Sequence, residues 1–166
     1  MTVRTKKMVM TALFAAFVCV ATMAIRIPSG SSGGYVNMGD GVVLLSAYIL
    51  GPLCGGLAAG IGSFLADIFA GYAVFAVPTL IIKFLMAFVS GLLFLEVFKK
   101  KKGLSLIACS VVGQIIMTVG YFITEIWMTG SVAAALLGIY GSITQSVFGI
   151  IVSFILYRLL AVKIKF

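Results

Sequence analysis

Long uncharged runs alternate with short basic or polar tracts along this chain. The first run, residues 8–25, follows a basic segment and is long enough to cross a membrane as one helix. The run at 41–66 contains no charged residue, but Gly51 and Pro52 interrupt it with the residues of a tight turn. The pattern predicts a short helix over residues 40–50, before this turn, and a longer helix after it.

Three further apolar runs complete the predicted bundle. Residues 71–78 are expected to form a turn, with Pro78 in the first turn of the next helix, which continues to Glu96. The last two helices are expected at roughly 104–128 and 132–160. The sequence therefore predicts an all-α integral membrane protein, with six transmembrane helices forming a single domain over residues 1–166.

Composition agrees with a membrane location. The chain is 63% hydrophobic and 10% charged, and it contains no histidine, so it has too little polar surface to cover a soluble domain. The net charge of +8 would suggest nucleic acid if the basic residues formed a stripe, but they lie in short tracts between apolar runs. We interpret the tracts as signals of membrane topology and exclude a nucleic-acid partner.

The basic tracts also predict the orientation of the bundle. With both termini cytoplasmic, the tracts at 4–7, 99–102 and 158–165 all lie inside, while Arg26 lies outside and Lys83 lies within the membrane. This asymmetry is typical of a multi-pass protein in a prokaryotic cell membrane. It places the segment after the first helix on the outer side, together with residues 71–78 and Glu125.

The segment at 26–39 is predicted to be an external loop. Its SGSSGG cluster interrupts the helical pattern and is expected to hold no regular element. Tyr35, Asn37 and Asp40 follow with an aromatic ring, an amide and a carboxylate. We interpret the loop as a lid over a binding site, although it could be a plain connection, and Asp40 could also cap the next helix.

Two isolated charges, Asp67 and Lys83, occur within apolar runs. An ionisable group in a membrane span is costly, so it faces protein or a water-filled cavity and is a candidate for function. A turn centred between them, near Phe75, would place both at the same depth, roughly 11 to 13 Å from the surface. The sequence thus allows an Asp67–Lys83 ion pair that is purely structural, or a shared ligand.

The last two helices each carry a polar row. Gln114, Thr118, Tyr121 and Glu125 are spaced by four, three and four residues, which places them on one helical face. One polar face on an apolar helix is expected to point toward a cavity. The final helix has a row of small and polar residues: Gly138, Ser142, Gln145, Gly149 and Ser153. We take Gln145 as a further binding candidate, although small residues along such a row can serve packing alone.

The first helix contains Ala12-x-x-x-Ala16, beside Ala15 and Cys19. A row of small side chains lets another helix approach closely, either inside the bundle or on a partner protein. Because the apolar run exceeds the usual core of a signal peptide, we expect this helix to be retained. The chain's three cysteines, each within an apolar run, are expected to be packing residues, and we expect no metal or cofactor.

These features together resemble a known family. The chain resembles the S-component of an energy-coupling factor (ECF) vitamin transporter. The likeness lies in the size of the chain, its six predicted helices, the A-x-x-x-A pattern, the sequence Y-V-N-M-G-D ending the first loop, the turn L-G-P-L-C-G-G and the segment P-T-L-I-I-K. The closest likeness is to the subfamily for riboflavin, hydroxymethylpyrimidine or pyridoxine. The resemblance implies capture of a vitamin outside the cell, followed by transport with a transmembrane T-component and two ATPases that dock through Ala12 and Ala16.

The residues themselves agree with a dependent transporter subunit. No G-x-x-x-x-G-K-[ST] phosphate loop is present, so ATP hydrolysis must come from a partner. An enzyme is disfavoured because no histidine, metal cluster or activated nucleophile is evident, and the alternative is a stand-alone carrier or channel. The acids Asp67 and Glu125 disfavour a multiply anionic ligand, so hydroxymethylpyrimidine or pyridoxine is preferred, with riboflavin as an alternative.

Overall fold

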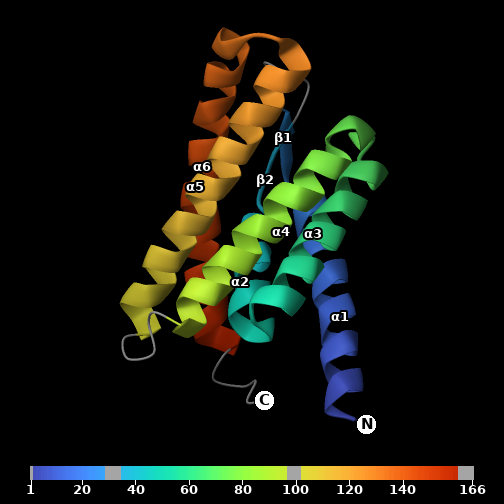
Figure 1. The fold of residues 1–166 in the computed structure, drawn as a ribbon, viewed down its shortest axis with the longest axis vertical. Helices are drawn as coiled ribbons and strands as arrows, with labels where there is room; N and C mark the ends of the chain where they lie inside the picture. Colours follow the sequence, from blue (N-terminus) through green and yellow to red (C-terminus); the bar gives the residue numbers. More distant parts are fainter. Residues whose placement is uncertain (1, 29–34, 97–101, 161–166) are drawn as a thin grey trace.

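The computed structural model describes residues 2–28, 35–96 and 102–160. Within these ranges the chain forms six helices and one two-stranded ribbon (Figure 1). In chain order the elements are α1 (Val3–Ala24), β1 (Arg26–Pro28), β2 (Tyr35–Asn37), α2 (Asp40–Leu50), α3 (Pro52–Phe69), α4 (Ala73–Glu96), α5 (Lys102–Thr129) and α6 (Val132–Leu160). Five of these helices are long and apolar enough to span a membrane, so the predicted helical membrane bundle is confirmed.

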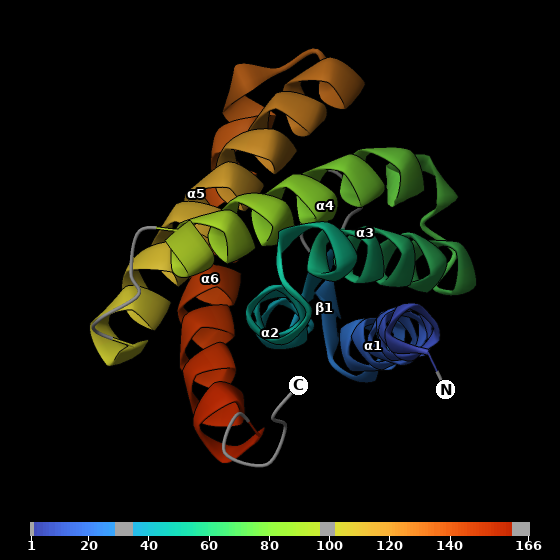
Figure 2. The same ribbon diagram turned by 60° about the horizontal axis from the view of Figure 1, so that its bottom comes forward.

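Helix α2 is the short member of the bundle. Its 11 residues rise about 16 Å, roughly half of a bilayer's hydrocarbon thickness. It packs against α1, α3, α4 and α6 and lies at the centre of the bundle (Figure 2). Its apolar side chains are nearly all buried. The β-ribbon stands above it, so the ribbon and α2 together occupy the length of one crossing.

Small residues let α3 pack closely against α4 and α1. A Cβ atom added to Gly60 would lie 2.9 Å from the carbonyl oxygen of Leu80 on α4. A Cβ atom on Gly62 would collide with the carbonyl oxygen of Ala15 on α1. Larger side chains at these positions would force the helices apart.

The helices diverge at one end of the molecule. The α3–α4 pair and the α5–α6 pair lean away from each other there, and the β-ribbon lies between them (Figure 1). Helix α1 begins and α6 ends at the opposite end, where α4 leads to α5.

The segment after α1 is more regular than we predicted. Strands β1 and β2 pair antiparallel, with Arg26 opposite Asn37 and Ile27 opposite Val36. Backbone polar groups beside an apolar bundle need hydrogen-bond partners, and the strands supply them to each other. The expectation of a wholly irregular loop was wrong for these six residues, while the Ser/Gly cluster at 29–34 lies outside the described residues.

The turn between α3 and α4 is shorter than predicted, and it lies earlier in the chain. Helix α4 begins at Ala73, so Pro78 lies inside the helix, and Gly71 adopts a φ of +83° in the turn. Membrane helices tolerate an internal proline because neighbouring groups satisfy the freed carbonyl. Measured from Gly71, Asp67 lies about 6 Å and Lys83 about 18 Å along their helices. The predicted equal depth of these two charges was therefore wrong.

Candidate ligand-binding site

A small cavity lies at the diverging end of the bundle, between β2 and helices α3, α4, α5 and α6. Its volume is about 60 Å³. The surrounding side chains are aromatic, acidic, amide and hydroxyl groups together with small residues. They are Tyr35, Val36, Asn37, Asp67, Phe75, Thr79, Tyr121, Glu125, Gly138, Ser142 and Gln145.

Tyr35 connects the ribbon to the end of α3. Its hydroxyl donates a hydrogen bond of 2.6 Å to Oδ1 of Asp67, and its ring lies 4.6 Å from that of Tyr72. Burial raises the pKa of the Tyr35 hydroxyl far above its ordinary value, and the neighbouring Asp67 raises it further. Tyr35 therefore remains protonated and acts as the donor, which fixes β2 against α3.

The buried ion pair joins Lys83 to Asp40, whereas the sequence had suggested Asp67 as the partner of Lys83. Both side chains of this pair are buried. Lys83 lies about three turns into α4, which brings its amino group to the start of α2 and away from the end of α3. The ion pair thus lies deeper than Asp67, beneath the cavity.

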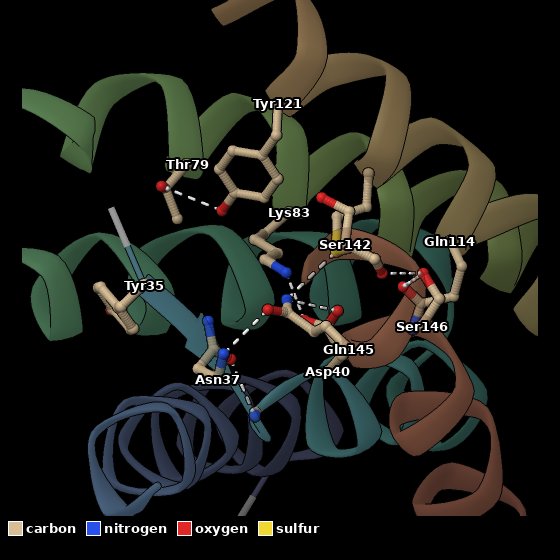
Figure 3. A network of polar contacts seen from close by, with 12 residues as sticks. Tyr35, Asn37, Asp40, Thr79, Lys83, Gln114, Tyr121, Ser142, Gln145 and Ser146 are labelled. Carbon is tan, nitrogen blue, oxygen red and sulfur yellow. Dashed lines mark hydrogen bonds and ion pairs between the residues drawn. The ribbon is translucent and has the colours of Figure 1, made fainter. Parts of the chain in front are cut away.

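Asp40 does not cap α2 as predicted. Gly39 occupies the N-cap position without a side-chain cap, and Asp40 is the first helical residue, with its side chain turned inward (Figure 3). The carboxylate is shared between Lys83 and the amide of Gln145. The local backbone is stabilised by Asn37, whose Oδ1 accepts a 2.9 Å hydrogen bond from the amide of Gly39.

Gln145 links three elements through the two ends of its amide. Its Nε2 donates to Oδ2 of Asp40 on α2 at 2.9 Å, and its Oε1 accepts from the backbone amide of Asn37 on β2, also at 2.9 Å (Figure 3). Gln145 itself is on α6 and is buried. The ribbon is therefore connected to the Asp40–Lys83 ion pair through one side chain.

Tyr121 brings α5 to the same region. Its hydroxyl donates a 3.2 Å hydrogen bond to Thr79 on α4, and the Lys83 amino nitrogen lies 5.4 Å from the centre of its ring. An ammonium group near an aromatic face is attracted to the negative face of the ring. Tyr121 therefore lines the cavity and also contacts the Asp40–Lys83 ion pair through Lys83.

Glu125 reaches the cavity from α5 because α6 leaves room for it. A Cβ atom on Gly138 would collide with the Glu125 carboxylate. Two acids, Asp67 and Glu125, therefore line the cavity, and none of the described lining residues is a lysine or arginine. The lining favours a ligand that donates hydrogen bonds or carries positive charge.

The structure brings together most of the residues predicted to bind substrate. Those on the cavity wall are Tyr35, Asn37, Asp67, Tyr121, Glu125 and Gln145. Asp40 and Lys83 lie beneath it, and Gln114 lies deeper along α5, where its Oε1 accepts a 3.2 Å hydrogen bond from Ser146. Their contact with a ligand stays a prediction.

Sequence reasoning missed several residues of the wall, among them Thr79, Phe75 and Val36. Thr79 precedes Lys83 by four residues and so lies on the same helical face, a signal that could have identified it. Phe75 was assigned to a turn because the start of α4 was placed too late. Val36 gives no chemical signal of its own. Gly138 and Ser142 belong to the row on the final helix from which only Gln145 was chosen as a binding candidate.

The predicted row of small residues on α1 is divided between two faces. Ala15 and Cys19 are buried in the bundle, whereas Ala12 and Ala16 are exposed. The A-x-x-x-A face is thus unoccupied by the described part of the chain. Within the same ranges, no three His, Cys, Asp or Glu side chains gather as a metal site.

Comparison with known proteins agrees with this architecture. A protein from Pyrococcus woesei, described as an uncharacterized protein in a gap 3' region, is 37% identical over 139 residues, which cover 81% of this chain and 88% of that protein. The family model described as "ECF-type riboflavin transporter, S component" matches residues 2–162, nearly the whole chain. This chain therefore belongs to the family of ECF-type riboflavin transporter S components.

Proposed function

We propose that this protein captures a small ring-bearing vitamin or vitamin precursor outside a prokaryotic cell and delivers it for ATP-driven uptake. The observation that carries the proposal is the cavity at the diverging end, walled by aromatic and polar side chains in a family of transporter S components. The basic tracts orient that end toward the outside. The ligand would enter where the β-ribbon covers the cavity.

Charge and size guide the choice of ligand. Asp67 and Glu125 face the cavity without a lysine or arginine on its described wall, which disfavours phosphorylated vitamins. The cavity of about 60 Å³ is smaller than the roughly 300–1,000 Å³ of typical ligand pockets, so the ribbon must move outward on loading. The smaller the ligand, the smaller that movement, which favours single-ring hydroxymethylpyrimidine or pyridoxine.

Riboflavin is the second candidate ligand, because the matching family model is described by that vitamin. Its three fused rings could stack against Tyr35 and Tyr121. Binding it would require a larger displacement of β2, and with it a break in the hydrogen bonds that Tyr35 and Asn37 make to α3 and α6.

Uptake would depend on partner proteins. The chain contains no phosphate loop, so the proposed partners are a T-component and two ATPase subunits. The exposed Ala12 and Ala16 on α1 support a helix-docking face there, because small side chains let a partner helix approach closely.

The test measures binding and uptake separately. Purified protein in detergent should bind one of the three vitamins by titration calorimetry. Vesicles containing this protein alone should not accumulate that vitamin, whereas vesicles that also contain the T-component and ATPases should do so with ATP. Accumulation by the chain alone would favour the stand-alone carrier or channel, and failure to bind any of the vitamins would contradict the proposal.

A further inference from the structure

One oxygen of Asp67 has no partner in the described structure. Asp67 is 3% exposed and lines the cavity. Its Oδ1 accepts the hydrogen bond from Tyr35, while Oδ2 is buried and makes no hydrogen bond. A buried carboxylate oxygen without a donor is costly, so native proteins rarely retain one without a use.

The position of Asp67 makes this cost larger. The residue lies within the last turn of α3, which ends at Phe69, and the negative end of a helix dipole disfavours a carboxylate. The Asp40 carboxylate, by contrast, has both Lys83 and Gln145 as donors. The two buried acids therefore differ, since Asp40 is satisfied within the protein and Asp67 is satisfied only in part.

Thr79 is the neighbouring hydroxyl that could compete for this oxygen. Its hydroxyl neighbours the Asp67 carboxylate and accepts a hydrogen bond from Tyr121, which leaves its own proton able to turn toward Asp67. The Thr79 hydroxyl nevertheless makes no hydrogen bond of normal geometry to Oδ2. Tyr121, Thr79 and Tyr35 all line the cavity with Asp67, so a ligand there would meet the Asp67 carboxylate and the rings of Tyr35 and Tyr121.

We propose that Asp67 Oδ2 is the acceptor for an N–H donor of the ligand, an amino group or a protonated ring nitrogen on a small flat heterocycle. The inference rests on the proposed function and assigns this oxygen as the subsite that selects among ligands. Tyr35 fixes the carboxylate by holding Oδ1, which leaves Oδ2 as the acceptor without a partner. An analogue with a carbonyl oxygen at the same position would oppose a negative charge with a lone pair.

The Asp67→Asn variant reverses this chemistry in a predictable way. Because Tyr35 donates to the oxygen at the Oδ1 position, keeping this bond places the asparagine NH₂ group where Oδ2 stood. The subsite then donates a hydrogen bond where it previously accepted one. If Asp67 had only a structural role, its substitution would not reverse the preference of the site for a hydrogen-bond donor on the ligand.

The experiment uses two pairs of probes that differ by nitrogen or oxygen at one position. One pair is 4-amino-5-hydroxymethyl-2-methylpyrimidine and its 4-oxo analogue, and the other is pyridoxamine and pyridoxal. Titration calorimetry on the purified full chain should show that the wild type prefers the amino member of at least one pair by about tenfold to a hundredfold. Asp67→Asn should lose or invert that preference, while the same acid-to-amide change at Glu96, which is exposed at the end of α4 and outside the cavity, should keep it in the control Glu96→Gln.

The possible outcomes distinguish failure of the proposed subsite from failure of the proposed function. An unchanged amino preference in Asp67→Asn, or an equal loss of preference in Glu96→Gln, would overturn the subsite. Binding of riboflavin with neither amino probe would also overturn it and leave the importer role intact. If the wild type bound no probe and no vitamin, the proposed function would fail, and the inference with it.

Discussion

Single and double substitutions of the Asp40–Lys83 ion pair are expected to change the free energy of unfolding by different amounts. Both groups are buried, and neither belongs to the cavity wall. Lys83→Met removes the cation and leaves Asp40 with only the Gln145 amide as a donor. Asp40→Asn leaves the ammonium group of Lys83 without a counter-charge.

The expected magnitude follows from the cost of an unpaired buried charge. Removing one partner of a buried pair costs about 3–5 kcal/mol, a large part of a typical free energy of unfolding. The double variant Asp40→Asn/Lys83→Met contains neither charge. Its asparagine oxygen still accepts from Gln145, so the loss is an unsatisfied amide NH₂, about 1–3 kcal/mol. The double variant should thus be more stable than either single variant.

Reversible unfolding in mixed micelles measures this comparison as a double-mutant cycle. If the pair serves the scaffold alone, ligand affinity of the double variant should remain within a few-fold of the wild type, because the pair lies below the cavity. Additive destabilisation by the two substitutions would refute the proposed coupling of the charges. A stable double variant that no longer binds ligand would show instead that the pair contacts the ligand.

Three further predictions concern the helix surfaces. Replacing Ala12 and Ala16 by tryptophan should abolish ATP-driven uptake in vesicles yet leave calorimetric affinity within a few-fold, and unimpaired uptake would remove the docking role. Gly62→Val should lower the free energy of unfolding by about 1–3 kcal/mol, since its side chain would collide with α1, and an unchanged value would contradict the close packing. Gly138→Ala should displace the Glu125 carboxylate and weaken binding about tenfold while the protein stays folded, and wild-type affinity would show that Glu125 does not contact ligand.

The helices and their buried faces were predictable from the sequence, because both follow from the spacing of apolar and small residues within a single helix. The bounds of α2 and α6 coincide with the prediction, and the row Tyr121 to Glu125 reaches the cavity as its spacing indicated. Such patterns depend on which face of one helix is apolar. They require no knowledge of the neighbouring helices.

The pairing of the buried charges was not predictable, because it depends on where a turn begins. Moving the α3–α4 turn toward Gly71 changed the depth of Lys83 by several residues and gave it Asp40 as a partner. The β-ribbon was missed because its formation also depends on contacts with distant parts of the chain. Its strands are three residues long, and their pairing is stabilised by Tyr35 and Asn37 contacts to distant helices rather than by local propensity.

The most direct test of the central claim is to identify what the protein carries when it is purified from cells. Mass spectrometry of the extracted small molecules should find one ring-bearing vitamin or precursor in near-stoichiometric amount with the wild type. A variant whose cavity is filled, Ser142→Phe, should fold but retain little of that compound, because Ser142 lines the cavity. The absence of any enriched compound, or equal amounts with both proteins, would contradict the assignment of this cavity as the vitamin site.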